Sequence, residues 1–152
     1  MFCDLEEALK DEIGAGHIAV VPDVTAAFGA LDAKFPTRPS RIAWERIGDR
    51  QEIDVLSSPR TISSDELQAE LAAHRASVES WFVSLGIDAE TEVMWLGDMC
   101  DSGFRMPLAV FFEHFELLFS MPQHSYVLPD DARWCLNYVM EGQLFFGMSP
   151  DS

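Results

Sequence analysis

The sequence predicts a single α+β domain over residues 1–152, with helices packed on a mixed, mainly antiparallel sheet that ends in a C-terminal β-hairpin. Three observations lead to this fold class. A chain of 152 residues, 48% of them apolar, is long enough to bury one core. Helical and extended patterns alternate, but no Gly-rich phosphate loop follows an extended run, which argues against a doubly wound parallel sheet. The chain closes on two aromatic-rich runs joined by Glu141-Gly142, a typical hairpin turn.

The N-terminal part of the chain alternates between the two patterns. Apolar residues recur at helical spacing over Phe2–Ile13, which predicts a first helix. His17–Val21 contains β-branched residues and stops at a proline, so we expect a short strand there. A helix follows over Ala26–Lys34, and the two prolines of Phe35–Ser40 predict a loop.

The middle of the chain contains the clearest helix. Ile42–Trp44 fits either a short helix or a strand, and Glu52–Leu56 alternates as a strand does. Ser63 and Glu66 form the S-x-x-E pattern of a capping box, which predicts a helix start. Apolar residues continue at helical spacing from there to Leu85, where a glycine ends the helix.

A strand, a loop and a second helix follow. Glu92–Leu96 is predicted to form a strand, and Gly97–Gly103 a loop bounded by glycines. Phe104–Met106 is expected to re-enter the sheet. A helix then runs over Pro107–Ser120, because proline is favoured in the first turn and a wide aromatic face continues at helical spacing.

The C-terminal stretch is expected to lie well inside the sheet. It holds three extended runs: His124–Leu128, Trp134–Met140 and Gln143–Met148. In the second run, Trp134, Leu136, Tyr138 and Met140 share one face, while Cys135, Asn137 and Val139 lie on the other. Neither face has a clear apolar or polar character, which predicts a strand that is covered on both sides.

Negative charge is the strongest global signal. The net charge is −16, and residues 77–152 carry 12 acidic side chains against two basic ones, Arg105 and Arg133. A field of this sign repels nucleic acid and anionic membranes, so neither is expected as a partner. It attracts basic proteins and speeds their association. Solubility alone accounts for such charge equally well.

Cysteine usage and the N-terminus predict a cytoplasmic protein. The three cysteines, Cys3, Cys100 and Cys135, are far apart and form no C-x-x-C, so we expect reduced thiols. The N-terminus is acidic and lacks the features of a signal peptide, and no apolar run is long enough to span a membrane.

The sequence contains no motif of nucleotide, zinc-protease, serine-hydrolase or calcium-binding type, and we expect no enzyme and no cofactor. Two chemical alternatives can still be drawn. A thiol site would combine Cys100 with His114 or His124 and Asp101. An oxygen-ligand metal site would combine Asp98 and Asp101 with Glu113 and Glu116; because no histidine motif accompanies these acids, no metal site is predicted.

Acidic clusters are therefore the candidate partner-binding sites. They lie in the loop after residue 97, on the helix over 107–120 and in the turn before the hairpin. A tryptophan beside that turn is the best candidate for an interface anchor, since tryptophan is enriched at interfaces. The predicted partner-binding residues are Asp98, Asp101, Glu113, Glu116, Asp130, Asp131 and Trp134. Each acid taken singly is more often a solvated surface residue.

The segment YVLPDDARWCLNYVMEGQLFFG (Tyr126–Gly147) resembles the closing strands of bacterial immunity proteins from contact-dependent growth inhibition and related polymorphic-toxin systems. His17–Pro36 is similar to such chains as well. The resemblance implies a small cytoplasmic protein that binds and neutralises the C-terminal domain of a cognate toxin, often a nuclease, and has no catalytic residues. The alternatives are a small cysteine- or metal-dependent enzyme and an acidic adaptor for another basic protein.

Overall fold

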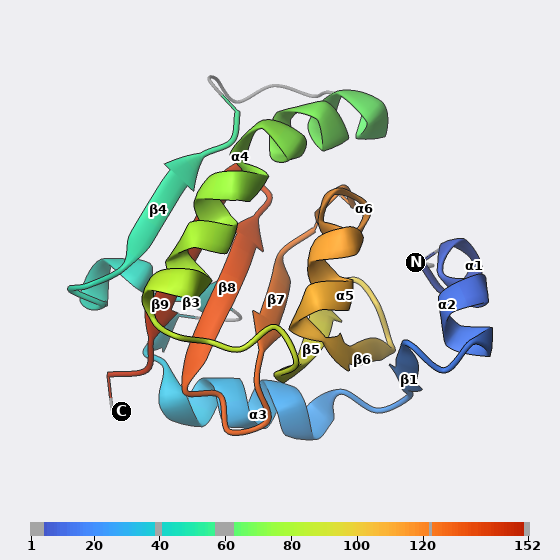
Figure 1. Ribbon diagram of the computed structural model, residues 1–152. Helices are drawn as coiled ribbons and strands as arrows, with labels where there is room; N and C mark the ends of the chain where they lie inside the picture. The colour runs from blue at the N-terminus through green and yellow to red at the C-terminus, as the bar shows by residue number, and fades with distance from the viewer. Residues whose placement is uncertain (1–4, 39–40, 57–62, 122, 151–152) are drawn as a thin grey trace.

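A computed structural model describes residues 5–38, 41–56, 63–121 and 123–150 (Figure 1). Seven strands form one sheet in the order β1-β6-β5-β7-β8-β9-β4, and every neighbouring pair is antiparallel. The strands of this sheet are β1 (Ala19–Val21), β4 (Gln51–Asp54), β5 (Glu92–Gly97), β6 (Gly103–Pro107), β7 (Ser125–Leu128), β8 (Trp134–Val139) and β9 (Gln143–Met148). The predicted α+β class is confirmed.

Helices cover both faces of this sheet, which gives three layers. One face packs against the short N-terminal helices and the long helix α4, together with α5 and α6. The other face packs against α3 and the chain that follows it. The elements outside the sheet are α1 (Leu5–Ala8), α2 (Lys10–Gly14), α3 (Thr25–Lys34), β2 (Thr37–Arg38), β3 (Arg41–Ile42), η1 (Trp44–Arg46), α4 (Ser64–Ser84), α5 (Leu108–Glu113) and α6 (Phe115–Phe119).

Strands β8 and β9 form the predicted hairpin, and β8 lies inside the sheet between β7 and β9. Trp134, Leu136 and Tyr138 all point into the core beneath α4 and α6. Cys135 points to the α3 side, so both faces of the strand are covered as predicted. Gly142 has φ = 91° in the turn, a conformation that glycine adopts at little cost.

Helix α4 confirms the capping box. The Ser63 hydroxyl accepts a hydrogen bond from the Glu66 N–H, and the Glu66 side chain accepts one from the Ser63 N–H. The helix crosses β8 and β9 in Figure 1 and buries Val78 and Phe82 against the sheet. The apolar pattern overestimates the buried stripe at its end, because Leu85 is 51% exposed.

Four predicted elements differ from the structure. The segment Phe35–Ser40, predicted as a loop, contains the two-residue strand β2, which pairs with β3. The first helix is interrupted at Leu9, so α1 and α2 are separate short helices. The helix predicted over Pro107–Ser120 is broken at His114, whose φ and ψ of −115° and 20° lie outside the helical range. The ambiguous segment Ile42–Trp44 begins at the end of the two-residue strand β3 and ends at the start of the 3₁₀ helix η1.

Two further predictions, on the cysteines and on membrane spans, can be compared with the structure. Cys100 is disulfide-bonded, so the prediction of reduced thiols is wrong for this residue; Cys135 is a buried free thiol, and Cys3 lies outside the described residues. Within the described ranges, no helix is long and apolar enough to cross a membrane.

Candidate functional site: an acidic cleft beside helix α3

A cleft of about 720 Å³ opens beside α3, on the face of the sheet that this helix covers. Its walls come from α3 and the turn before it, from β3, from the loop after β5 and from β7. Among the described residues that line it, the charged ones are four aspartates and Arg41. The aspartates are Asp23, Asp32, Asp98 and Asp101.

The inner wall of the cleft is apolar. Phe28 and Leu31 come from α3, and Tyr126 comes from β7. The rings of Phe28 and Tyr126 pack edge to face, with 5.8 Å between their centroids. Burial raises the pKa of the Tyr126 hydroxyl, so this group stays protonated and adds no charge. The cleft therefore combines an aromatic and aliphatic surface with carboxylates at its rim.

Negative charge dominates the rim because Arg41, the one basic side chain among the described residues that line the cleft, is already paired. Arg41 donates from Nη2 to Oε2 of Glu141 in the hairpin turn, at 3.2 Å. Asp23 accepts a hydrogen bond from the Thr25 N–H at 3.0 Å. This bond lowers the pKa of Asp23, which keeps the carboxylate ionised. The cleft thus presents a net negative field to solvent.

The loop after β5 is held by buried groups. Gln123, which is fully buried, accepts a hydrogen bond from the Met99 N–H at 2.7 Å. Gly97 leaves the room that this side chain needs, because a Cβ there would lie 2.7 Å from Gln123. The Asp98 N–H donates to the His124 carbonyl at 3.1 Å, and Asp98 Oδ1 accepts from the His124 N–H at 3.2 Å. The Asp98 carboxylate is therefore positioned before any partner binds.

The predicted acidic residues do not form one surface. Asp98 and Asp101 line the cleft, whereas Glu113 and Glu116 belong to the helices on the opposite face of the sheet. The two glutamates also face different neighbours: Glu116 lies 3.7 Å from Arg75 of α4, and Glu113 lies beside His114. The oxygen-ligand cluster drawn from these four residues is therefore not assembled.

The acidic side chains in the turn before the hairpin are less available to a partner than predicted. Asp130 forms an ion pair with Arg105, on the other side of α3 from the cleft. Asp131 is exposed, and its Oδ1 accepts a hydrogen bond from the Arg133 N–H at 3.2 Å. The prediction that Trp134 is an interface anchor is wrong. This tryptophan is fully buried under α4, so it is a core residue and not an interface anchor.

Sequence reasoning missed Asp23, Asp32 and Arg41 as members of the cleft. These residues are distant in sequence from the loop after β5, and only the packing of α3 and β3 on the sheet brings them to it. Their own neighbourhoods show turn and helix signals and no functional motif, so no local pattern could have selected them.

Neither of the described cysteines offers a reactive thiolate. Cys100 is disulfide-bonded, so its sulfur is not available as the nucleophile of the thiol site that the sequence allowed. Cys135 is completely buried, and burial raises the pKa of its thiol, which keeps the sulfur protonated.

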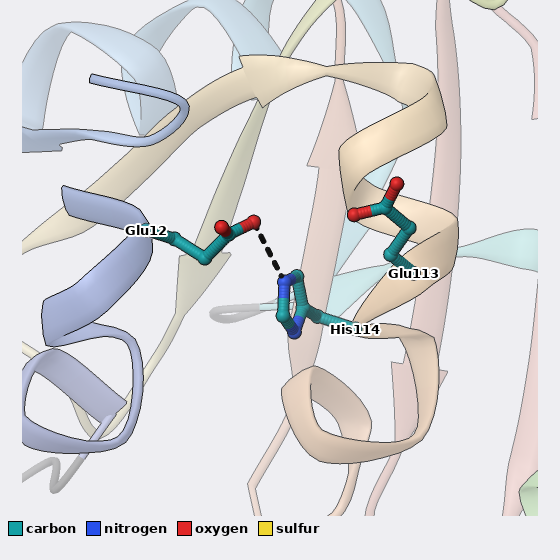
Figure 2. Close-up of side chains that lie close together, drawn as sticks. All are labelled: Glu12, Glu113 and His114. Carbon is teal, nitrogen blue, oxygen red and sulfur yellow. Dashed lines mark hydrogen bonds and ion pairs between the residues drawn. The ribbon is translucent and has the colours of Figure 1, made fainter. Parts of the chain in front are cut away.

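One group of side chains within the described ranges has the spacing of metal ligands: Glu12, Glu113 and His114, drawn in Figure 2. It lies where α2 meets the junction of α5 and α6, away from the acidic cleft. Sequence reasoning considered Glu113 and His114 separately and did not connect either with Glu12.

No protein-family model matches the chain, and no curated protein matches it in sequence. The resemblance to immunity proteins therefore remains a prediction.

Proposed function

We propose that this protein is an immunity-type inhibitor that binds a basic toxin domain, of the nuclease class, and blocks its active site with the acidic cleft. The observation that carries the proposal is the cleft itself, where four aspartates accompany an apolar wall and Arg41, the one basic residue among its described lining residues, is paired with Glu141. A nuclease active site is built to hold phosphates and so presents lysine and arginine side chains. Carboxylates match that charge in sign.

The shape of the cleft suits long basic side chains. Lysine and arginine have apolar stems and charged heads, and they bury the stem while the head remains at a polar rim. Phe28 and Leu31 give the cleft an apolar surface for the stem, and the exposed carboxylates of Asp98 and Asp101 line the same cleft as partners for the head. Charge-assisted hydrogen bonds between guanidinium and carboxylate are among the stronger polar contacts in proteins.

Fixed geometry supports binding as well. The loop that carries Asp98 is tied to Gln123 and His124 in the free protein. Less conformational entropy is then lost when a partner docks, which leaves more of the contact energy as affinity.

The proposed place of action is the cytoplasm, where an incoming toxin would be neutralised. Reducing compartments disfavour disulfides, so the state of Cys100 in cells bears on this part of the proposal. Alkylation of thiols in rapidly acidified cells, followed by mass spectrometry, measures whether this disulfide is also present in cells. A fully oxidised Cys100 would contradict the cytoplasmic assignment without touching the binding proposal.

Co-expression with the toxin domain encoded beside this chain tests the function directly. The wild type is expected to rescue growth. A triple variant, Asp32→Asn, Asp98→Asn and Asp101→Asn, keeps the size of each side chain and an acceptor oxygen at residue 98. With three cleft charges removed, binding is expected to weaken by about 100-fold or more, measured by titration calorimetry.

The control removes the same number of charges elsewhere: Glu6→Gln, Asp11→Asn and Glu90→Gln, all exposed and outside the cleft. It is expected to bind and rescue nearly as the wild type does. Failure of the wild type to rescue cells would reject the immunity function. Equal loss in both triple variants would show that total charge matters and the cleft does not.

A further inference from the structure

A second group of polar side chains lies where the N-terminal helices meet the junction of α5 and α6. Glu12 of α2 reaches across to His114, with 3.1 Å between Glu12 Oε2 and His114 Nε2 (Figure 2). Glu113 completes the group, since one ligand atom from each of the three residues lies within 4.8 Å of the others. We propose that Glu12, Glu113 and His114 bind one divalent transition-metal ion of the Zn²⁺ class.

The spacing of the ligand atoms is close to what such an ion requires. Bonds of about 2.0–2.2 Å to nitrogen and oxygen place the ligands of a tetrahedral zinc ion about 3.3–3.5 Å apart. The Glu12–His114 pair is already at 3.1 Å. Glu113 is exposed, so its side chain has room to rotate toward the other two ligands. The ion takes the place of the direct Glu12–His114 hydrogen bond, and a water completes its coordination.

The break in the helix explains how neighbouring residues come to share a ligand. Successive side chains of a regular α-helix point about 100° apart, so residues at i and i+1 do not face one partner. His114 ends α5 and precedes α6 with non-helical φ and ψ of −115° and 20°. The interruption lies at the residue whose imidazole meets Glu12, and a carboxylate oxygen of the preceding Glu113 lies within 4.8 Å of the same Glu12 carboxylate.

The other oxygen of Glu12 is also held. His17, in the segment between α2 and β1, places Nδ1 3.1 Å from Glu12 Oε1. Ligating carboxylates in metal sites are commonly oriented by such a partner. His17 is therefore a positioning residue, and Glu12 has one oxygen held and the other directed at the site.

The imidazole also selects among ions. Calcium and magnesium take oxygen ligands, whereas imidazole favours zinc, copper and nickel. The bound ion ties the N-terminal helices to α5 and α6, because its ligands Glu12 and His114 are 102 positions apart in sequence.

Zn²⁺ titration of the full chain, purified without a polyhistidine tag and stripped with EDTA, tests the site. The expected result is one Zn²⁺ per chain at micromolar concentration, with no competition from excess Ca²⁺. Glu12→Gln and His114→Gln are expected to abolish this binding. Glu113→Gln changes only an exposed side chain, so it keeps the fold. It is expected to weaken binding by at least about tenfold, since even partners of metal ligands contribute roughly 10–100-fold.

Matched controls make the same substitutions nearby. Glu116→Gln on α6 and His74→Gln on α4 are expected to leave Zn²⁺ binding unchanged. His17→Ala is expected to weaken binding by a smaller factor, and His17→Gln, whose amide can donate to the same oxygen, to restore it. Absence of stoichiometric binding by the wild type, or equal affinities for Glu113→Gln and Glu116→Gln, would overturn the proposal and leave the Glu12–His114 contact as an ordinary hydrogen bond.

Discussion

Trp134 shows how one buried residue joins the long helix to the sheet. Its ring packs edge to face on Phe82 of α4, with 5.0 Å between the ring centroids, and its centroid lies 5.9 Å from that of Phe146 of β9. Its Nε1 has no hydrogen-bond partner among the described residues, so packing alone accounts for its contribution.

Replacing this residue is expected to affect stability and not the binding surface. Trp134→Ala should lower the free energy of unfolding by about 3–5 kcal/mol, since it leaves a large cavity in a packed core. Urea unfolding measures this. Met148 is paired with Trp134 in the β8–β9 register but is 38% exposed. Met148→Ala is the control and should cost less than about 1 kcal/mol. Similar values for the two variants would contradict the packing described here.

His124 makes the stability of the fold depend on pH. Its ring is buried, its Nδ1 accepts a hydrogen bond from the Met140 N–H at 3.3 Å, and burial followed by the charge of Arg41 lowers its pKa. The unfolded chain therefore takes up a proton at a higher pH than the folded chain does.

The sign of the effect follows from this difference. Stability should be fully present above the unfolded histidine pKa of about 6.5 and should fall as the pH drops below it, by at most about 1.4 kcal/mol per pH unit for this one group. Urea midpoints between about pH 8 and pH 5.5 measure the slope, above the range where most carboxylates titrate. His124→Gln should flatten the slope, and His74→Gln should not. An unchanged slope in His124→Gln would rule out this residue as the source.

At the scale of the element, α4 shows how a local capping motif determines where a helix begins. Ser63 and Glu66 satisfy each other's backbone groups at its first turn. Ser63→Ala should therefore destabilise the protein by about 1 kcal/mol. Ser77→Ala, an exposed mid-helix change of the same kind, should be neutral or slightly stabilising because alanine is the better helix former. Denaturant unfolding of both variants measures the difference, and equal stabilities would show that the cap contributes nothing.

The helix over 107–120 shows where such signals fail. Phe111, Phe115 and Phe119 continue the apolar periodicity through residue 114, and all three are buried as the pattern predicts. The pattern carries no trace of the break, because burial is preserved on both sides of it. The Glu12–His114 contact joins residues far apart in sequence, which a local pattern cannot show.

At the scale of the molecule, the sequence was informative about layers and less so about surfaces. Alternating apolar faces such as that of β8 predicted the covered sheet and the hairpin, since strand periodicity depends on local residues. The cleft depends on α3 crossing the sheet near the loop after β5, which no local pattern encodes. Asp98 and Asp101 were found because they cluster in sequence; Asp23 and Asp32 were not.

The charge of the whole molecule should control the rate at which it meets a basic partner. A net charge of −16, with four aspartates at one cleft, attracts a positive domain over several ångströms of solvent. The association rate constant with the cognate toxin domain, measured by stopped-flow fluorescence, should therefore fall steeply as NaCl rises from about 50 to about 500 mM, because the Debye length shortens below the range of the field.

The dissociation rate should change less with salt, because contacts inside the cleft are partly shielded from it. The triple variant Asp32→Asn, Asp98→Asn and Asp101→Asn should show a shallower salt dependence of association than the control triple, which has the same net charge. Equal salt slopes would mean that the field of the whole molecule steers the partner and the position of the aspartates does not. An association rate independent of salt would remove electrostatic steering from the proposed function altogether.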